Sequence, residues 1–171
     1  MPDARDDLLD RILTEATTNG LADRSLRDLA AAVGSSHRML HYHFGSRAGL
    51  VGALVQRVES AQRELLVELA AEADGVADLV MTLWYRTAAP EMLPFVRLFF
   101  ECVAATGGEG LTEPWMDVAA EVAEMIGVEL DADELRLAVA VSRGLLIDVL
   151  ATGDATAATR SMRRFVALWG V

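Results

Sequence analysis

The sequence of 171 residues contains one cysteine, four prolines and no lysine, so all 15 of its basic residues are arginine. A single cysteine, Cys102, excludes a disulfide framework within one chain, and its apolar neighbours indicate a packing role. The scarcity of proline beside abundant Ala, Leu and Val favours helices over strands. No uncharged apolar run reaches the ~18 residues that a membrane helix needs. The opening residues also lack the apolar region of a signal peptide, so we expect a soluble cytoplasmic protein.

Positive charge is scarce overall but concentrated in one place. The formal net charge is −11, yet residues 24–47 hold four arginines against one aspartate, a net of +3, which leaves −14 for the rest. No acidic residue occurs from 29 to 58, and all three histidines lie within the stretch SHRMLHYHFGSR at 36–47. Such a basic region on an acidic protein can bind a polyanion locally. A chance fluctuation in surface charge is the alternative.

Hydrophobic spacing predicts an all-α fold of about nine helices, bounded by glycine, proline and capping residues. The expected spans are about 5–18, 25–33, 36–44, 47–72, 75–87, 114–127 and 155–169, with one more helix that begins near Pro90 and Pro94. A further helix ends near 152 and is capped by Asp131 or Asp133. Gly107, Gly108 and Gly110 are expected to form a loop.

Residues 25–44 have the spacing of a helix-turn-helix, in which a turn of about three residues joins two short helices. Ser25 and Asp28 predict a capping box for the first helix. Gly34 ends that helix, and Ser35 or Ser36 caps the next one.

The second of these helices has two different faces when 100° is allowed for each residue. Leu40 and Phe44 fall on the buried side, and Arg38 and Tyr42 point directly away from it. The flanks carry Met39 and His41, whereas His37 and His43 lie near the edge of the core. Exposed faces of ordinary surface helices carry Glu and Lys, so this acid-free face suits a phosphate-rich partner.

The sequence SLRDLAAAVGSSHRMLHYHFGSRAGLVGAL, at 25–54, resembles the DNA-binding domain of the TetR family of transcriptional regulators. The resemblance extends from residue 5 to about 55 and includes three helices. Three positions depart from the residues usual in the family: Ser35 replaces an apolar residue, His41 a tyrosine and Arg47 a lysine. The resemblance implies a helix-turn-helix DNA-binding domain at 1–46 and a helical effector-binding and dimerisation domain at 47–171. It also implies a homodimer whose recognition helices enter successive major grooves of a palindromic operator.

Several residues of the helix-turn-helix are candidates for DNA contact. Arg38 suits the O6 and N7 atoms of guanine, and Met39 can touch a thymine methyl group. Histidine and tyrosine side chains can donate to phosphates or bases, and Arg27 and Arg47 lie in first helical turns, where free amides also bind phosphate. The complete predicted set is Ser25, Arg27, Ser36, His37, Arg38, Met39, His41, Tyr42, His43 and Arg47.

Other interpretations of the histidines are weaker. His37 and His41 have the i, i+4 spacing of a metal chelate, but no Glu, Asp or Cys lies nearby to complete the ligands, so no metal or cofactor is expected. No nucleophile or partner carboxylate accompanies them, and residues 75–130 offer no polar catalytic cluster, so we do not expect an enzyme. For His43, two interpretations are equally supported: a position at the edge of the core, held by hydrogen bonds, and a contact with DNA.

The last two predicted helices indicate that the chain forms a dimer. The helix LRLAVAVSRGLLIDVLAT is apolar nearly all round, which is typical of a helix buried on two sides. With the last helix, it would form a four-helix interface in a dimer, as the family implies. Two ordinary core helices of a monomer are the alternative.

Aromatic residues of the middle helices are candidates for contact with a small apolar or amphipathic effector: Trp84, Tyr85, Phe95, Phe99 and Trp115. The alternative is that these residues belong to an ordinary hydrophobic core, which has the same apolar composition as a ligand pocket. Arg143 within the apolar helix is interpreted as an intersubunit or buried ion-pair residue, with a carboxylate ligand as the alternative. The sequence therefore predicts a ligand-responsive transcriptional regulator, with a repressor favoured. The alternative is a helical dimerisation or small-molecule-binding protein without operator control.

Overall fold

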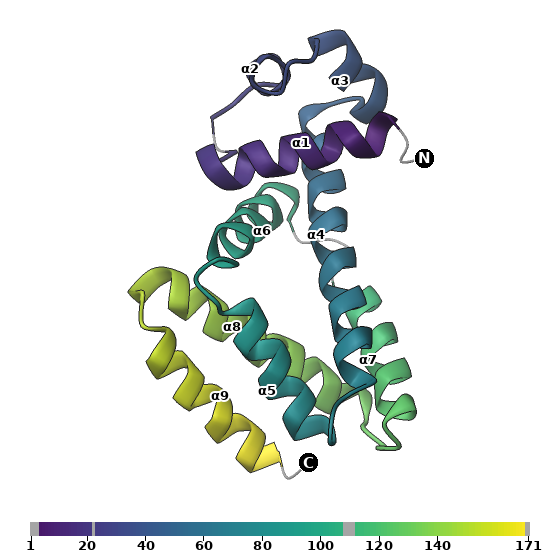
Figure 1. Ribbon diagram of the computed structural model, residues 1–171, viewed down its shortest axis with the longest axis vertical. Coiled ribbons are helices and arrows are strands. Elements are labelled where there is room, and N and C mark those ends of the chain that lie inside the picture. The colour runs from purple at the N-terminus through teal and green to yellow at the C-terminus, as the bar shows by residue number, and fades with distance from the viewer. Residues whose placement is uncertain (1–3, 22, 108–111, 170–171) are drawn as a thin grey trace. The chain divides into compact units, whose positions relative to one another are not determined.

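The computed structural model describes residues 4–21, 23–107 and 112–169. Over those residues the chain forms nine α-helices and no strand (Figure 1). The helices are α1 Ala4–Asn19, α2 Leu26–Ala32, α3 His37–Phe44, α4 Arg47–Ala70, α5 Val76–Thr87, α6 Leu93–Thr106, α7 Glu113–Met125, α8 Ala132–Thr152 and α9 Ala155–Trp169. The predicted all-α class is confirmed. The loop expected at 107–110 lies mostly outside the described residues.

Contacts divide the chain into two compact units. The first comprises Met1–Ser60 and Pro94–Glu109, and the second comprises Ala61–Leu93 and Gly110–Val171. The first unit therefore combines α1, α2 and α3 with the start of α4 and nearly all of α6. None of the helices in the described residues has both the length and the apolar character that a bilayer-spanning segment requires.

The core of the first unit is built from the inward faces of its short helices. Helix α1 buries Leu8, Leu9, Ile12 and Ala16, in agreement with the predicted amphipathic pattern. Leu29 of α2, Leu40 of α3 and Leu54 of α4 have no exposed surface. Because these side chains come from different helices, their burial fixes the orientation of α2 and α3.

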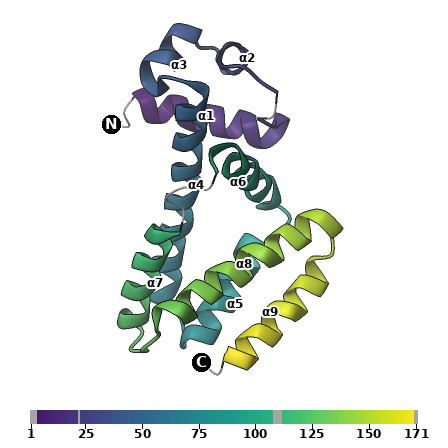
Figure 2. The ribbon, with the colours of Figure 1, turned by 180° about the vertical axis from the view of Figure 1, so that it is seen from behind.

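In the second unit, α9 packs against both α5 and α8, as the two opposite views show (Figures 1 and 2). Trp84 of α5 is 2% exposed, and its indole Nε1 donates to Thr159 Oγ1 of α9 at 2.9 Å. A separate apolar cluster joins Leu66 and Ala70 of α4 to Leu79 of α5 and Val122 of α7.

Candidate nucleic-acid interface

The start of α2 is fixed by a reciprocal cap. The amide of Asp28 donates to Ser25 Oγ at 3.2 Å, and the Ser25 amide donates to Asp28 Oδ2 at 2.9 Å, which confirms the predicted capping box. The Ser25 hydroxyl also donates to the same carboxylate at 2.6 Å. These hydrogen bonds, first from the Ser25 side chain and then from its backbone, lower the pKa of Asp28.

The turn between α2 and α3 is short and closed by backbone hydrogen bonds. Gly34 adopts φ +64°, and the amide of Ser35 returns to the carbonyl of Ala30 at 2.8 Å. Ser36, not Ser35, is the N-cap of α3, and its Oγ accepts from the Met39 amide at 3.2 Å. The helix-turn-helix expected at 25–44 is therefore present.

Helix α3 separates its side chains as helical spacing predicts. Leu40 is fully buried and Phe44 is 8% exposed, whereas Tyr42 is 79% and Met39 is 42% exposed. Arg38 lies on the same exposed side. His37 and His41 are exposed too, with ring centroids 6.3 Å apart. The outward face thus presents cationic, aromatic and thioether groups without a carboxylate.

His43 differs from the other two histidines because it is half-buried. Its Nε2 atom is buried and has no hydrogen-bond partner among the described residues. The edge of its ring meets the Tyr42 ring at a centroid distance of 5.0 Å, with 76° between the planes. Nε2 therefore faces the protein, as expected for a core-edge residue, although the expected hydrogen bond is not seen.

Two of the four arginines in the basic stretch at 24–47 bind other groups of the protein. Arg24 Nη1 pairs with Glu15 Oε1 of α1 at 2.9 Å. Arg47 donates from Nε to the carbonyl of Arg24 and from Nη2 to the carbonyl of Leu21, both at 3.0 Å. Arg27 and Arg38 are exposed, and neither forms a hydrogen bond or ion pair within the described part of the chain.

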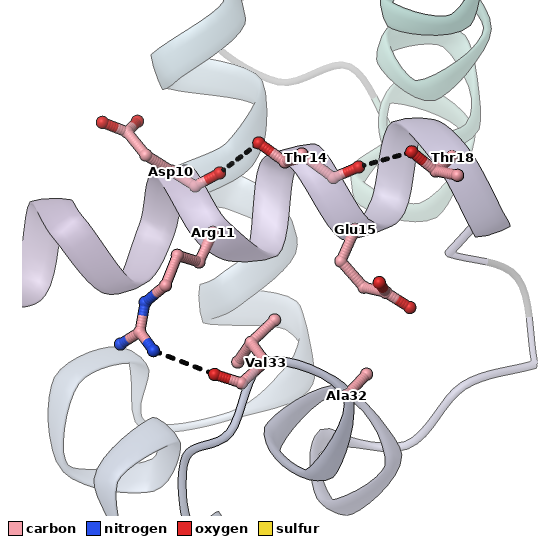
Figure 3. A pocket seen from close by; sticks show the side chains of 7 residues that line it. All are labelled: Asp10, Arg11, Thr14, Glu15, Thr18, Ala32 and Val33. Carbon is pink, nitrogen blue, oxygen red and sulfur yellow. Dashed lines mark hydrogen bonds between the residues drawn. The ribbon is translucent and has the colours of Figure 1, made fainter.

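Two further arginines, which sequence reasoning missed, hold α1 against its neighbours. Arg11 Nη1 donates to the Val33 carbonyl at the end of α2 at 2.9 Å, as Figure 3 shows. Arg57 of α4 pairs with both carboxylate oxygens of Asp10 at 2.9 and 3.0 Å. No local pattern could reveal these pairs, because their partners lie 22 and 47 residues away in sequence.

A shallow groove lies between α1 and the end of α2 (Figure 3). Its lining consists of Asp10, Arg11, Thr14, Glu15, Thr18, Ala32 and Val33. The charged groups of this groove are engaged in the pairs described above. The hydroxyls of Thr14 and Thr18 donate to carbonyls of their own helix.

The residues predicted to contact an effector fall in both units. Phe95 and Phe99 belong to the first unit, where Phe99 is 7% exposed and its ring meets the edge of Phe100. Trp84, Tyr85 and Trp115 belong to the second. Tyr85 is 48% exposed, and its hydroxyl accepts from Arg163 Nη2 at 2.7 Å. Trp115 packs on the apolar cluster of Leu66, and its buried Nε1 has no partner among the described residues.

Residues that could bind a metal ion do not gather in the part of the chain that the structure describes. No group of three or more His, Cys, Asp or Glu side chains is arranged there as a ligand set. Cys102 is buried and forms no disulfide. Burial raises the pKa of its thiol to about 11, with a further increase from Glu101 and an opposing effect of Arg47.

Comparison with known proteins finds similarity at the level of structure. No protein-family model matches the sequence, and no curated protein matches it. A TetR-family regulator from Pectobacterium atrosepticum is 19% identical, with a TM-score of 0.76 over 96% of this chain and 90% of that one. GusR from Salmonella enterica is 19% identical, with a TM-score of 0.65 over 96% and 94%.

A third solved structure, the TetR-family regulator PfmR from Thermus thermophilus, is 19% identical, with a TM-score of 0.58 over 99% of this chain and 96% of that one. The likeness therefore includes the C-terminal helices as well as the helix-turn-helix. Structural likeness at such low identity shows the fold. This chain has the all-helical fold of the TetR-family transcriptional regulators.

Proposed function

We propose that the protein is a transcriptional regulator that reads DNA with α3. The observation that carries this proposal is the exposed face of α3, which presents Arg38, Met39 and Tyr42 without any acidic neighbour. A helix of this kind fits the major groove, whose base edges offer acceptors to arginine and methyl groups to apolar side chains. The acidic remainder of the chain disfavours binding of DNA elsewhere.

The proposed contacts divide into base reading and positioning. Arg38 reads a guanine, and Met39 meets a thymine methyl group. Tyr42, His37 and His41 donate to phosphates or base edges, and Arg27 meets phosphate at the start of α2. The caps Ser25 and Ser36 lie beside free amides that can bind phosphate as well.

The C-terminal helices support the further proposal that the protein binds a palindrome as a homodimer. Leu137 and Ile147 of α8 are 52% and 51% exposed, and Leu168 of α9 is 68% exposed. Burial of these side chains against a second copy would remove apolar surface from water. A second copy related by a two-fold axis would place two α3 helices on two half-sites about one helical turn of DNA apart.

A small apolar or amphipathic effector is the proposed signal, and release of DNA on its binding would make the protein a repressor. The buried, unpartnered indole N–H of Trp115 supports a site in the second unit, because such a donor gains from a ligand acceptor. The effector must bind one dimer geometry better than another to shift the equilibrium. Roles for Trp84, Tyr85, Phe95 and Phe99 belong to the same proposal.

The proposal is tested by selecting duplexes from a randomised library with the full-length protein and titrating the recovered duplex by fluorescence anisotropy. Arg38→Ala is expected to cost about 1–3 kcal/mol per half-site and to relax preference at one base position. Arg86→Ala, an exposed arginine of α5, is the matched control and should bind as the wild type does.

Light scattering should give about twice the 18.4 kDa chain mass for all three proteins. Recovery of a palindrome that Arg38→Ala binds as tightly as the wild type would refute the assignment of α3. If a dimer forms but no duplex is enriched, a dimerisation or small-molecule-binding protein without operator control becomes the better description.

A further inference from the structure

Arg47 begins α4, yet its side chain reaches back to the segment between α1 and α2. Its Nε and Nη2 atoms donate to the carbonyls of Arg24 and Leu21, each at 3.0 Å. A guanidinium presents these donors in one rigid plane, so it can hold two carbonyls at once in a fixed relative position. The side chain thus joins residues that are 23 and 26 positions apart in sequence.

The segment that Arg47 holds has an unusual backbone. Gly20 adopts φ +76°, and Asp23 adopts φ +60°, a left-handed conformation that non-glycine residues seldom take. Leu21 and Arg24, the residues that accept from Arg47, lie on either side of Asp23. Hydrogen bonds on both flanks stabilise a turn that local preferences alone would not select.

The charge of Arg47 also acts on a buried thiol of the first unit. The thiol of Cys102, on α6 of the same unit, has its pKa raised by burial, and the charge of Arg47 opposes that increase. A cation in the first turn of α4 is also unfavourable toward the helix dipole, so the bonds to Leu21 and Arg24 give a reason for its presence.

The contacts of Arg47 bear on the orientation of α3. Arg47 follows the end of α3 by only three residues, and its partner Arg24 directly precedes the Ser25 cap of α2. The two carbonyl contacts therefore join the start of α4, which follows α3, to the segment that leads into α2. We propose that Arg47 is a positioning residue that fixes α3 relative to α2 for DNA reading, and that it is not a phosphate ligand. This inference rests on the proposed function.

Phosphate binding by the basic stretch at 24–47 then depends mainly on Arg27. Within residues 24–47, Arg24 pairs with Glu15, and Arg47, although exposed, donates to two carbonyls. Arg27 is the exposed arginine of this stretch that has no such partner and can meet phosphate beside the base-reading Arg38. Arg47 keeps its charge and still contributes to the potential. A direct phosphate contact, in contrast, releases counterions and appears in the dependence of affinity on salt.

The test compares Arg47→Gln with the matched control Arg27→Gln on the duplex recovered by selection, over a range of salt concentrations. Each phosphate contact contributes about −0.9 to the slope of log K against log salt, so Arg27→Gln should reduce the slope by about 1.8 for two half-sites. Arg47→Gln should change the slope by less than half of that amount. It should nevertheless weaken binding about tenfold or more, because each subunit loses two hydrogen bonds that orient α3.

A slope reduced by about 0.9 or more in Arg47→Gln, or affinity equal to the wild type, would overturn the proposal. A second measurement needs no DNA: hydrogen exchange of the arginine Nε–H groups in the free full-length protein. The Nε–H of Arg47 should exchange more slowly than that of Arg27, and equal rates would exclude the contact with Arg24. If no duplex is recovered, the proposed function fails, and the exchange rates alone decide whether Arg47 holds the turn.

Discussion

Gly49 offers a sharp test of the junction between α3 and α4. The chain leaves α3 through Gly45 at φ +72°, Ser46 caps α4, and the Gly49 amide donates to Ser46 Oγ at 3.0 Å. A Cβ atom at Gly49 would overlap the carbonyl oxygen of Phe44. That oxygen belongs to the backbone at the end of α3, so Gly49→Ala must displace either α3 or α4.

The size of the effect follows from comparison with Gly52 in the same helix. A Cβ at Gly52 meets no atom within 4 Å, so Gly52→Ala gains only the helix preference of alanine, about 0.5–1 kcal/mol. Gly49→Ala gains a similar preference but adds a backbone clash, and overpacking of this kind costs about 1–3 kcal/mol. The difference in unfolding free energy between the two variants therefore isolates the clash.

Thermal unfolding at one fixed protein concentration measures this difference. For a chain of this size, a difference of about 2 kcal/mol corresponds to roughly 4–8 °C in Tm, with Gly49→Ala the less stable variant. Duplex affinity should also fall in Gly49→Ala and stay unchanged in Gly52→Ala. Equal Tm values for the two variants would show that Gly49 does not approach Phe44 and that the described junction is wrong.

Two predictions concern ionisable groups. Cys102 should react with a thiol reagent at pH 8 about 100-fold more slowly than an exposed cysteine, because its pKa of about 11 lies two units above the ordinary 9.0. Rapid reaction of the folded protein would contradict the burial of this thiol. Asp28 has a lowered pKa in the folded state, so its capping contribution is complete above the ordinary value of 3.8 and is lost as pH falls through the lower folded value. Carboxyl NMR titration should show this low pKa. Ser25→Ala should raise the pKa toward the ordinary value because the side-chain hydrogen bond, its largest cause, is lost, whereas an unchanged titration in that variant would exclude the cap.

Local signals made the helices predictable. Ser25 and Asp28 marked the start of α2, Gly34 its end, and the spacing of Leu40 and Phe44 gave the buried face of α3. Each of these features depends on residues within a turn or two of one another. The choice between Ser35 and Ser36 as the cap of α3 could not be made in advance, because both side chains offer the same acceptor.

Long-range contacts of the arginines could not be predicted in the same way. Arg47 and Arg27 look alike in sequence, since both lie in the first turn of a helix within the basic stretch. The difference between them arises from Leu21 and Arg24, whose carbonyls accept from Arg47 although they lie 26 and 23 residues before it in the sequence. The same holds for Arg57 and its partner Asp10, which belong to different helices.

The absence of lysine gives these contacts a common physical basis. A guanidinium can bind two carbonyls or both oxygens of a carboxylate, as Arg47 and Arg57 do, whereas an ammonium group acts as a point charge. Arginine therefore serves as an internal link as well as a surface cation in the first unit. A count of basic residues in the sequence overstates the charge that this unit can offer directly to phosphate.

That smaller number of available cations affects how the proposed regulator would select its site. Nonspecific binding of DNA depends mostly on phosphate neutralisation, which is weak when few cations make contact and the remaining chain carries −14. Discrimination between DNA sequences must then come from the contacts of α3 with bases, and Arg38 is the main hydrogen-bond donor for these contacts. Orientation of α3 becomes correspondingly important, because a misaligned helix cannot be retained on the duplex by phosphate contacts. A turn held by Arg47 supplies that orientation before DNA is bound, so that less conformational entropy is lost on binding.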